Sequence, residues 1–213
     1  MKTIKALTLI VVIAGFSVTF AQELKPIKLP APQTEIGKPL MQSLKLRSTN
    51  RNFDSKPLPA QELSNLLWAA YGINRPESGK RTAPSAMNWQ EIDIYVALQE
   101  GVYLYDAKLH QLTPAATGDL RALTGKQDFV KAAPVNLIYV ADMKKVSRAS
   151  DSDILMWSGA DCGFIAQNVY LYCASQGLAV VVRGLVDKTK LAEELKLRPE
   201  QKIILCQTVG YGK

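Results

Sequence analysis

The segment SDILMWSGADCGFIAQNVYLYCASQ, residues 152–176, is the longest stretch of this chain with the spacing of an α-helix. Apolar and small side chains recur in it every three or four positions, and Gly177 follows where the pattern stops. Both faces of the helix carry apolar side chains, so we expect it to be widely buried. The positions at helical spacing are Ile154, Trp157, Ser158, Asp161, Cys162, Ile165, Val169, Tyr172 and Cys173.

Shorter patterns lie on both sides of this helix. Residues 91–98, 101–106, 134–141, 179–182 and 202–209 alternate or are mostly apolar, and each predicts a strand. Helices are predicted at 40–46, at 61–71 and from Asp187, a suitable N-cap, through Leu197. Residues 74–84 are rich in turn formers and predict a loop. This order of elements gives the fold class α+β, with a mixed sheet rather than a doubly wound one.

The composition is that of a globular chain. Its 213 residues are 47% hydrophobic and 21% charged, with a net charge of +7, and they suit one domain. The basic residues are scattered, which argues against a nucleic-acid partner. The only histidine is His110, and the three cysteines form no CxxC, so no metal site is expected. Cys162, Cys173 and Cys206 lie in apolar patterns, which favours buried thiols over a disulfide.

The N-terminus has the pattern of a targeting segment. Residues 1–21 have a basic start, a short apolar run and a small-residue cleavage site, so they predict a cleavable signal peptide and an exported, periplasmic protein. The run is shorter than the ~20 residues of a spanning helix, so we expect no stable membrane span. Residues 22–39 contain four prolines and predict an extended arm, either free or draped over another surface. The domain itself is predicted at 40–213.

Three polar segments could carry chemistry. Residues 47–53 (RSTNRNF) place two guanidinium groups and two hydroxyls together, which suits a phosphate or a ring rich in carbonyls. Residues 84–90 (PSAMNWQ) lead into a strand and could bind the edge of a heteroaromatic ring, and residues 182–187 (VRGLVD) join a core strand to a helix. Taken singly, each also fits an ordinary loop or turn.

Taken together, the segments resemble the nitroreductase family of FMN-dependent oxidoreductases, and most of all its SagB-type dehydrogenase branch. The resemblance runs from Leu40 to Gly212. Its motifs are Arg47-x-Thr49-x-Arg51-x-Phe53, Pro84-Ser85 with Asn88 and Gln90, Gly101 to Asp106 with His110, Leu112 and Gly118-Asp119, Asp161-x-Gly163 with Ala166 to Asn168 and Leu171, and Val209-Gly210-Tyr211. It implies a nitroreductase-like fold, a mixed and mainly antiparallel sheet flanked by helices, in a homodimer with FMN at the interface.

The resemblance also implies the roles of particular residues. Arg47, Ser48, Thr49 and Arg51 would hold the phosphate and the pyrimidine edge of the flavin, with Arg51 beside N1 and the C2 carbonyl, where reduction places negative charge. Ser85, Ala86 and Asn88 would reach the ring from the partner subunit. The backbone of Arg183 and Gly184 would face the flavin N5 side. No catalytic acid or base is expected, because the reactive atom belongs to the cofactor.

Two features depart from the family pattern. Arg183 occupies a position that is often Glu in relatives, and a cation there would favour anionic acceptors or donors. The family's C-terminal extension does not follow Lys213, so we expect phosphate binding either to depend on Arg47 or to be weaker.

These features leave four hypotheses for the function. The first is an oxidoreductase passing a hydride or electrons to a small-molecule acceptor such as a nitroaromatic or a quinone, with NAD(P)H as an electron donor, although NAD(P)H is scarce outside the cytoplasm. The others are a SagB-like azoline dehydrogenase, a non-catalytic periplasmic flavin-binding module and a structural envelope protein.

Overall fold

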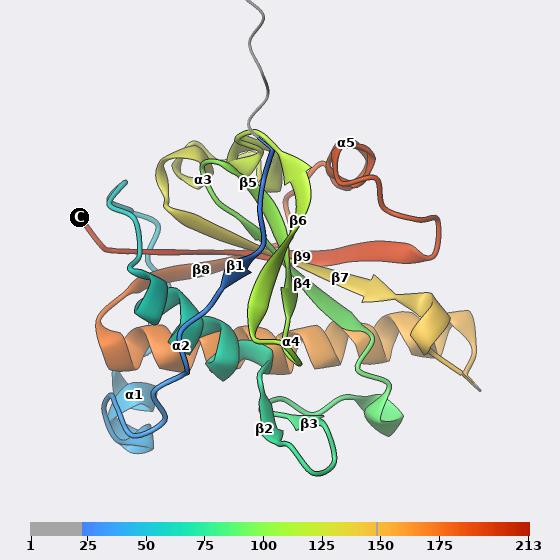
Figure 1. Cartoon of the computed structure of the whole chain (residues 1–213), viewed down its shortest axis with the longest axis horizontal. Helices are drawn as coiled ribbons and strands as arrows, with labels where there is room; N and C mark the ends of the chain where they lie inside the picture. Colours follow the sequence, from blue (N-terminus) through green and yellow to red (C-terminus); the bar gives the residue numbers. More distant parts are fainter. Residues whose placement is uncertain (1–22, 148) are drawn as a thin grey trace, which may run out of the picture.

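A computed structural model describes residues 23–147 and 149–213 of the chain, so the predicted signal peptide at 1–21 lies outside the described residues. Among them, seven strands form one sheet in the order β1-β6-β5-β4-β7-β9-β8 (Figure 1). The strands are β1 (Ile27–Lys28), β4 (Ile92–Ala97), β5 (Gly101–Asp106), β6 (Gln111–Thr117), β7 (Val135–Asp142), β8 (Ala179–Arg183) and β9 (Gln201–Gly210).

The sheet is antiparallel at every pairing between these described strands, so the prediction of a mixed sheet was wrong on this point. The long helix α4 (Asp151–Gln176) connects β7 to β8, which are parallel to each other. They do not pair, because β9 lies between them and runs antiparallel to both. The α+β fold class follows directly from this arrangement.

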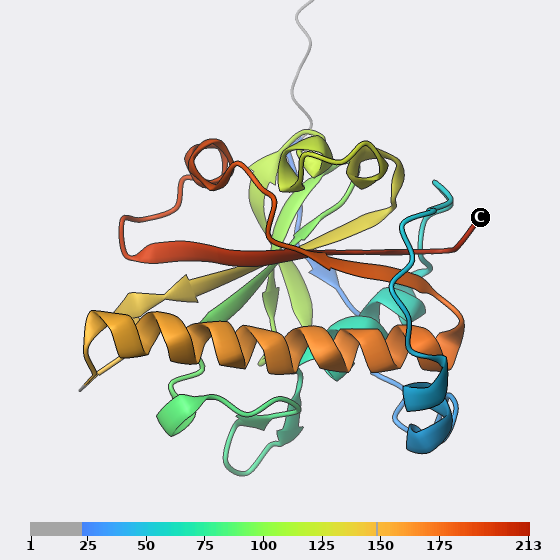
Figure 2. The same cartoon turned by 180° about the vertical axis from the view of Figure 1, so that it is seen from behind.

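The central strand β7 explains why helices cover both faces of the sheet. All eight of its residues are buried. Leu137 and Tyr139 belong to the same core as residues of α4 and of α2 (Ala60–Tyr71), whereas Ile138 and Val140 pack with Leu191 of α5 (Lys188–Glu194). Because successive side chains of a strand point to opposite faces, a mostly apolar strand such as PVNLIYVA must be packed against other elements on both faces of the sheet. Figures 1 and 2 show α4 and α2 on one face of the sheet and α5 on the other.

Local signals set the ends of the helices. Helix α4 begins where the Ser150 side chain accepts a hydrogen bond from the Asp153 amide at 3.3 Å, and it ends at Gly177, whose φ is 76°. The Asp187 side chain caps α5 by accepting from the Lys190 amide at 3.1 Å, as predicted. Helix α5 ends at Glu194 rather than Leu197, because Lys196 turns into the left-handed region with φ 51°. The helix predicted at 40–46 is α1 (Leu40–Leu46), and the shorter α3 spans Phe129–Ala132.

Two connecting segments differ from the prediction. Residues 74–84 are not simply a loop, because β2 (Ile73–Arg75) and β3 (Lys80–Arg81) form a small hairpin there. Strand β6 was not predicted, since Pro114 interrupts its pattern. A proline donates no hydrogen bond, and the register of β5 against β6 shifts between Val102 and Tyr103, beside this residue.

The proline-rich arm is draped over the domain. Its two-residue strand β1 pairs with β6, and the Pro30 carbonyl accepts a hydrogen bond from the Ser64 hydroxyl of α2 at 2.6 Å. The Gln33 amide donates to Asn65 Oδ1 at 2.8 Å. The three cysteines are free and buried, as expected. No helix in the described ranges is long and apolar enough to cross a membrane.

Candidate functional site

The loop at residues 47–53 lies along the β8 edge of the sheet. It begins where α1 ends, and the Asn50 amide donates to the Val180 carbonyl at 3.0 Å. At its far end Phe53 is buried and forms a β-bridge with Gly212. The sheet edge therefore holds both ends of the loop, and the polar residues between them are exposed or half-buried.

Tyr170 of α4 joins this loop to the end of β8. Its hydroxyl lies 3.2 Å from Thr49 Oγ1 and accepts a hydrogen bond from the Val182 amide at 3.0 Å. The Arg47 guanidinium lies over the tyrosine ring, 5.4 Å from its centroid. One side chain thus brings Arg47 and Thr49 to the strand end that carries Arg183 and Gly184. We did not predict a role for Tyr170, although it stands four residues after Ala166 on the inner face of the helix.

The donors of this loop are available to an anion. Arg47 and Arg51 make no ion pair and no side-chain hydrogen bond with any other described residue. Ser48 and Arg51 are exposed, while Arg47 is half-buried against its tyrosine. Two uncommitted guanidinium groups beside two hydroxyls fit a phosphate and the carbonyl edge of a ring.

The second predicted segment adopts an unusual backbone. Ser85 precedes a short 3-10 turn, η1 (Ala86–Asn88), in which Met87 and Asn88 have φ values of 48° and 57°. Such values are uncommon for residues other than glycine and indicate local strain. The turn is held by Asp161 of α4, whose Oδ2 accepts from the Ala86 amide at 2.8 Å. This strain makes an ordinary turn a poor description of the segment.

The structure does not bring the two segments together within one chain. Figure 2 shows the blue helix α1 and the green turn at 86–88 below opposite halves of the orange helix α4. Their anchors, Tyr170 and Asp161, are nine residues apart on α4, or about 13 Å at the helical rise. Ser85, Ala86 and Asn88 therefore lie far from Arg47 of the same chain.

The position of the Arg183 side chain contradicts one expectation. Its guanidinium is 6% exposed and lies on the sheet face away from α4, where it donates to the Thr124 carbonyl and to the side chains of Asn136 and Thr208. A cation held inside the protein in this way does not select anionic acceptors or donors by direct contact. Strand alternation is the cause, because Val182 faces α4 and its neighbour must face the other way. Gly184 is exposed just beyond it.

The outer face of α4 is apolar and uncovered. Leu155, Met156 and Phe164 are 60%, 61% and 48% exposed. At Gly159 and Gly163 no atom of the described residues, apart from the adjoining backbone of α4 itself, lies within 4 Å of the position that a Cβ would take. This strip of α4 is open to close approach by another surface.

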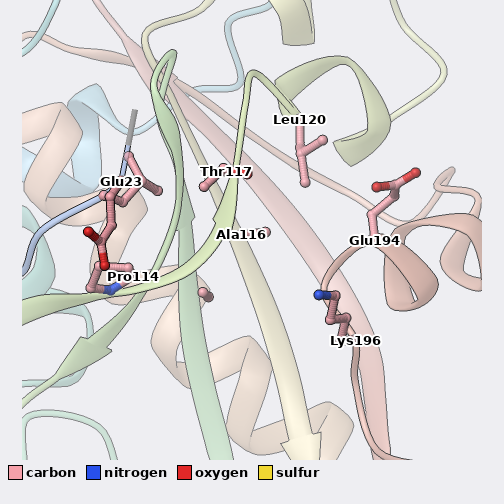
Figure 3. Close-up of a pocket in the computed structure, with 9 residues that line it drawn as sticks. Glu23, Pro114, Ala116, Thr117, Leu120, Glu194 and Lys196 are labelled. Carbon is pink, nitrogen blue, oxygen red and sulfur yellow. The ribbon is translucent and has the colours of Figure 1, made fainter. Parts of the chain in front are cut away.

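A separate pocket of about 470 Å³ lies on the α5 side of the sheet (Figure 3). Glu23 and Pro114 line one side of it, and Glu194 and Lys196 the other. It contains none of the predicted site residues. Within the described ranges, no group of three or more His, Cys, Asp or Glu residues could hold a metal ion.

Comparisons with known proteins agree with this fold. The model of the "Nitroreductase family" matches residues 44–211. A Methanocaldococcus jannaschii protein named "Putative nitroreductase MJ1384" is 33% identical over an alignment of 180 residues, which covers 77% of this chain and 90% of the relative. A crystal structure from Ralstonia eutropha, described as "a putative nitroreductase", is 45% identical with a TM-score of 0.84, and the match covers 88% of this chain and 90% of that one.

A more distant structure has the same fold. The nitroreductase family protein of Clostridium difficile has a TM-score of 0.61 at 21% identity, covering 83% of this chain and 86% of the other. The fold and the comparisons define an α+β oxidoreductase. The chain belongs to the nitroreductase family.

Proposed function

We propose that this protein is an FMN-dependent oxidoreductase that works as a homodimer. The observation that carries the proposal is that the guanidinium groups of Arg47 and Arg51 have no ion-pair or hydrogen-bond partner among the described residues, in a loop that Tyr170 holds against the end of β8. Arg47, Ser48 and Thr49 would bind the phosphate, and Arg51 the pyrimidine edge, where a fixed cation stabilises negative charge. The flavin would supply the hydride chemistry at N5, and the backbone at Arg183 and Gly184 would face it.

The uncovered face of α4 supports the dimer. Two copies of α4 crossing with two-fold symmetry between residues 161 and 170 would bring the Tyr170 region of one copy to the Asp161 region of the other. The exposed Phe164 and the open Gly163 lie at that crossing. The same arrangement would place Ser85, Ala86 and Asn88 of the second copy beside Arg47. A site divided between two copies explains why the two segments are apart in one chain.

The acceptor and the donor are further parts of the proposal. We propose a small electron-poor acceptor, such as a nitroaromatic or a quinone. NAD(P)H is the proposed donor, and an "NADPH:FMN oxidoreductase" from Vibrio harveyi has a related fold, with a TM-score of 0.62 at 17% identity. Residues 1–21 are proposed to direct export to the periplasm, where another donor would be needed.

An azoline dehydrogenase is the second candidate. The motif Gly101 to Asp106 with His110 is the feature that favours it. A chain of the E. coli microcin synthetase complex, solved with a truncated precursor bound, shares the fold with a TM-score of 0.68 at 19% identity, covering 96% of this chain. Turnover of an azoline-containing peptide, in place of nitroaromatics or quinones, would favour this candidate.

The experiment uses two defective variants and their mixture. Arg47→Ala and Asn88→Ala should each bind FMN several-fold more weakly, measured by quenching of flavin fluorescence, because each loses contacts with the cofactor. Lys45→Ala removes an exposed charge of α1 without changing the site and is the matched control. Copies of the two variants, unfolded and refolded together, should recover intact binding in about a quarter of the sites, since half of the dimers are mixed and each has one unaltered site.

Two results would contradict the proposal. A colourless protein that cannot be reconstituted with FMN would refute the cofactor. Binding that is not restored in the mixture would show that one chain holds the whole site. Bound FMN without turnover of any acceptor would instead favour a non-catalytic flavin-binding module.

A further inference from the structure

Glu91 has a buried carboxyl group that makes no hydrogen bond or ion pair with the described residues. It stands directly before β4 and is 0% exposed. Neither of its carboxylate oxygens has a hydrogen-bond partner among the described residues, and it takes part in none of their ion pairs. An ionised carboxylate in such a place is strongly disfavoured, so the group is expected to carry a proton.

Asp161 is the acidic neighbour of Glu91. It is 3% exposed, and its Oδ2 accepts the hydrogen bond from the Ala86 amide. Burial raises the pKa of Glu91 and the Asp161 carboxylate raises it further, while the Glu91 backbone and the Ser158 hydroxyl oppose part of this increase. Burial also raises the pKa of Asp161, but the Ala86 amide and Glu91 lower it. The Asp161 carboxylate accepts from the Ala86 amide, whereas neither Glu91 oxygen has a donor among the described residues, so this geometry favours the proton on Glu91 and the negative charge on Asp161.

The surroundings offer this pair little compensation. The buried hydroxyls of Ser158 and Tyr71 have no hydrogen-bond partner among the described residues. The Arg81 guanidinium lies over the Tyr71 ring, 4.4 Å from its centroid, and already donates to Gln90 Oε1 and the Tyr71 carbonyl. The titratable groups that interact with the pair are Tyr71 of α2 and Cys162 of α4. Arg81 of β3 interacts with Tyr71, and Asp142 of β7 is ion-paired with Arg198.

The segment beside the pair needs an anchor. Met87, Asn88 and Gln90 all have positive φ values, and such strained conformations persist only where the surrounding structure compensates for their cost. The anchors include the Ala86 amide on Asp161 and the Trp89 ring, 5.5 Å from the ring of Trp157. Gln90 is held by its amide on Ser85 Oγ at 3.0 Å and by side-chain hydrogen bonds with Arg81 and Gly79. The bond to Asp161 is charge-assisted, so it depends on Asp161 being the ionised member of the pair.

We propose that Glu91 is a positioning residue for the strained segment 85–88: by keeping a proton, it leaves Asp161 as the charged acceptor that fixes Ala86. When Glu91 loses that proton to solvent, two carboxylates oppose each other in a buried site. Their repulsion separates Asp161 from Ala86 and releases the strained turn. The effect on FMN rests on the proposed function, whereas the effect on the turn itself does not.

The experiment uses the circular dichroism of Trp89, which directly follows the turn, to report on the position of the turn. The near-UV circular dichroism of the coupled Trp89 and Trp157 rings is recorded from about pH 5 to about pH 10, the range into which burial moves carboxyl pKa values. The purified protein is used as isolated, and Trp89→Phe identifies the signal. In the wild type the signal should fall as pH rises through the raised pKa of Glu91. In Glu91→Gln, which cannot ionise, it should remain constant, while the exposed-site control Glu77→Gln should behave like the wild type.

A second measurement does not depend on how the variant folds. Infrared difference spectra of the wild type should show one protonated carboxylic acid at neutral pH, which disappears with the same midpoint as the tryptophan signal. A wild-type signal that is independent of pH, a Glu91→Gln signal that still falls, or the absence of a protonated carboxyl would each overturn the proposal.

The link to the cofactor is measured separately. FMN binding by the wild type should weaken about tenfold over the same pH interval, the change that about 1.4 kcal/mol produces, and Glu91→Gln should abolish this dependence. If no variant binds FMN while the tryptophan signal behaves as expected, the proposed function fails and the role of Glu91 in positioning the turn remains supported.

Discussion

Tyr170→Phe tests the contact on which the site depends, because it removes one oxygen atom and keeps the ring under Arg47. The Val182 amide loses its acceptor in a partly buried strand, which costs about 1–2 kcal/mol, and the hydrogen bond with Thr49 is lost as well. We expect the free energy of unfolding to fall by about 1–3 kcal/mol, or the melting temperature by about 2–4 °C for each kcal/mol in a domain of this size.

Urea denaturation of the wild type, Thr49→Val, Tyr170→Phe and the double variant measures the contribution of the hydrogen bond between the Thr49 and Tyr170 hydroxyls. Thr49→Val should cost about 0.5–1 kcal/mol in the wild type and almost nothing in Tyr170→Phe, because the partner is already gone. Tyr211→Phe is the control, since the Tyr211 hydroxyl makes no hydrogen bond within the described ranges, and it should change stability by less than about 0.5 kcal/mol. If the Thr49 and Tyr170 effects simply add, the two hydroxyls do not act together and the loop is held in another way.

Two further predictions concern the buried Arg183 and the half-buried His110. Arg183→Lys should lower the free energy of unfolding by at least about 3 kcal/mol in urea denaturation, because one ammonium group cannot replace the guanidinium contacts with Thr124, Asn136 and Thr208; a loss below about 1 kcal/mol would contradict this. Burial lowers the pKa of His110, which lies between Ser64 and Tyr105, so its stabilising effect should be complete above about pH 6.5 and be lost as the pH falls through the lowered value. The melting temperature of the wild type should therefore fall more steeply below about pH 6.5 than that of His110→Asn. Melting temperatures that fall in parallel for the two proteins would be evidence against this role.

The elements that could be predicted from sequence are those in which a single local signal dominates. Helix α4 has a helical period and a terminal glycine, and β7 is a nearly continuous apolar run, so both were predicted nearly to the residue. Strand β6 was missed because Pro114 breaks its pattern, and only the neighbouring β5 shows that the segment extends the sheet. The sheet was predicted to be mixed because strand order is a property of the whole fold, and the insertion of β9 between β7 and β8 leaves no local trace.

The candidate site could be predicted only as separate pieces. Residues 47–51 and 85–88 were identified from residue type, and the structure adds how each is held. Tyr170 and Asp161 were not assigned to the site, because a tyrosine and an aspartate on the inner face of a helix are indistinguishable by spacing from ordinary core positions. The orientation of the Arg183 side chain was beyond the sequence as well, since it depends on which face of β8 meets α4.

The two side chains of α4 that hold the site segments, Tyr170 and Asp161, differ in charge because the two segments differ in backbone conformation. The loop at 47–53 has an extended path tied to the sheet edge, so the neutral Tyr170 hydroxyl is sufficient to join it to β8. The turn at 86–88 has a strained backbone and few ties to the sheet, so it depends on a charge-assisted bond, and Asp161 must remain ionised in a buried place. A buried charge of this kind needs a neighbour that stays neutral, which is the part that Glu91 plays. If the two halves meet across a dimer, the loop is a permanent element of the site and the turn is the element whose position responds to pH.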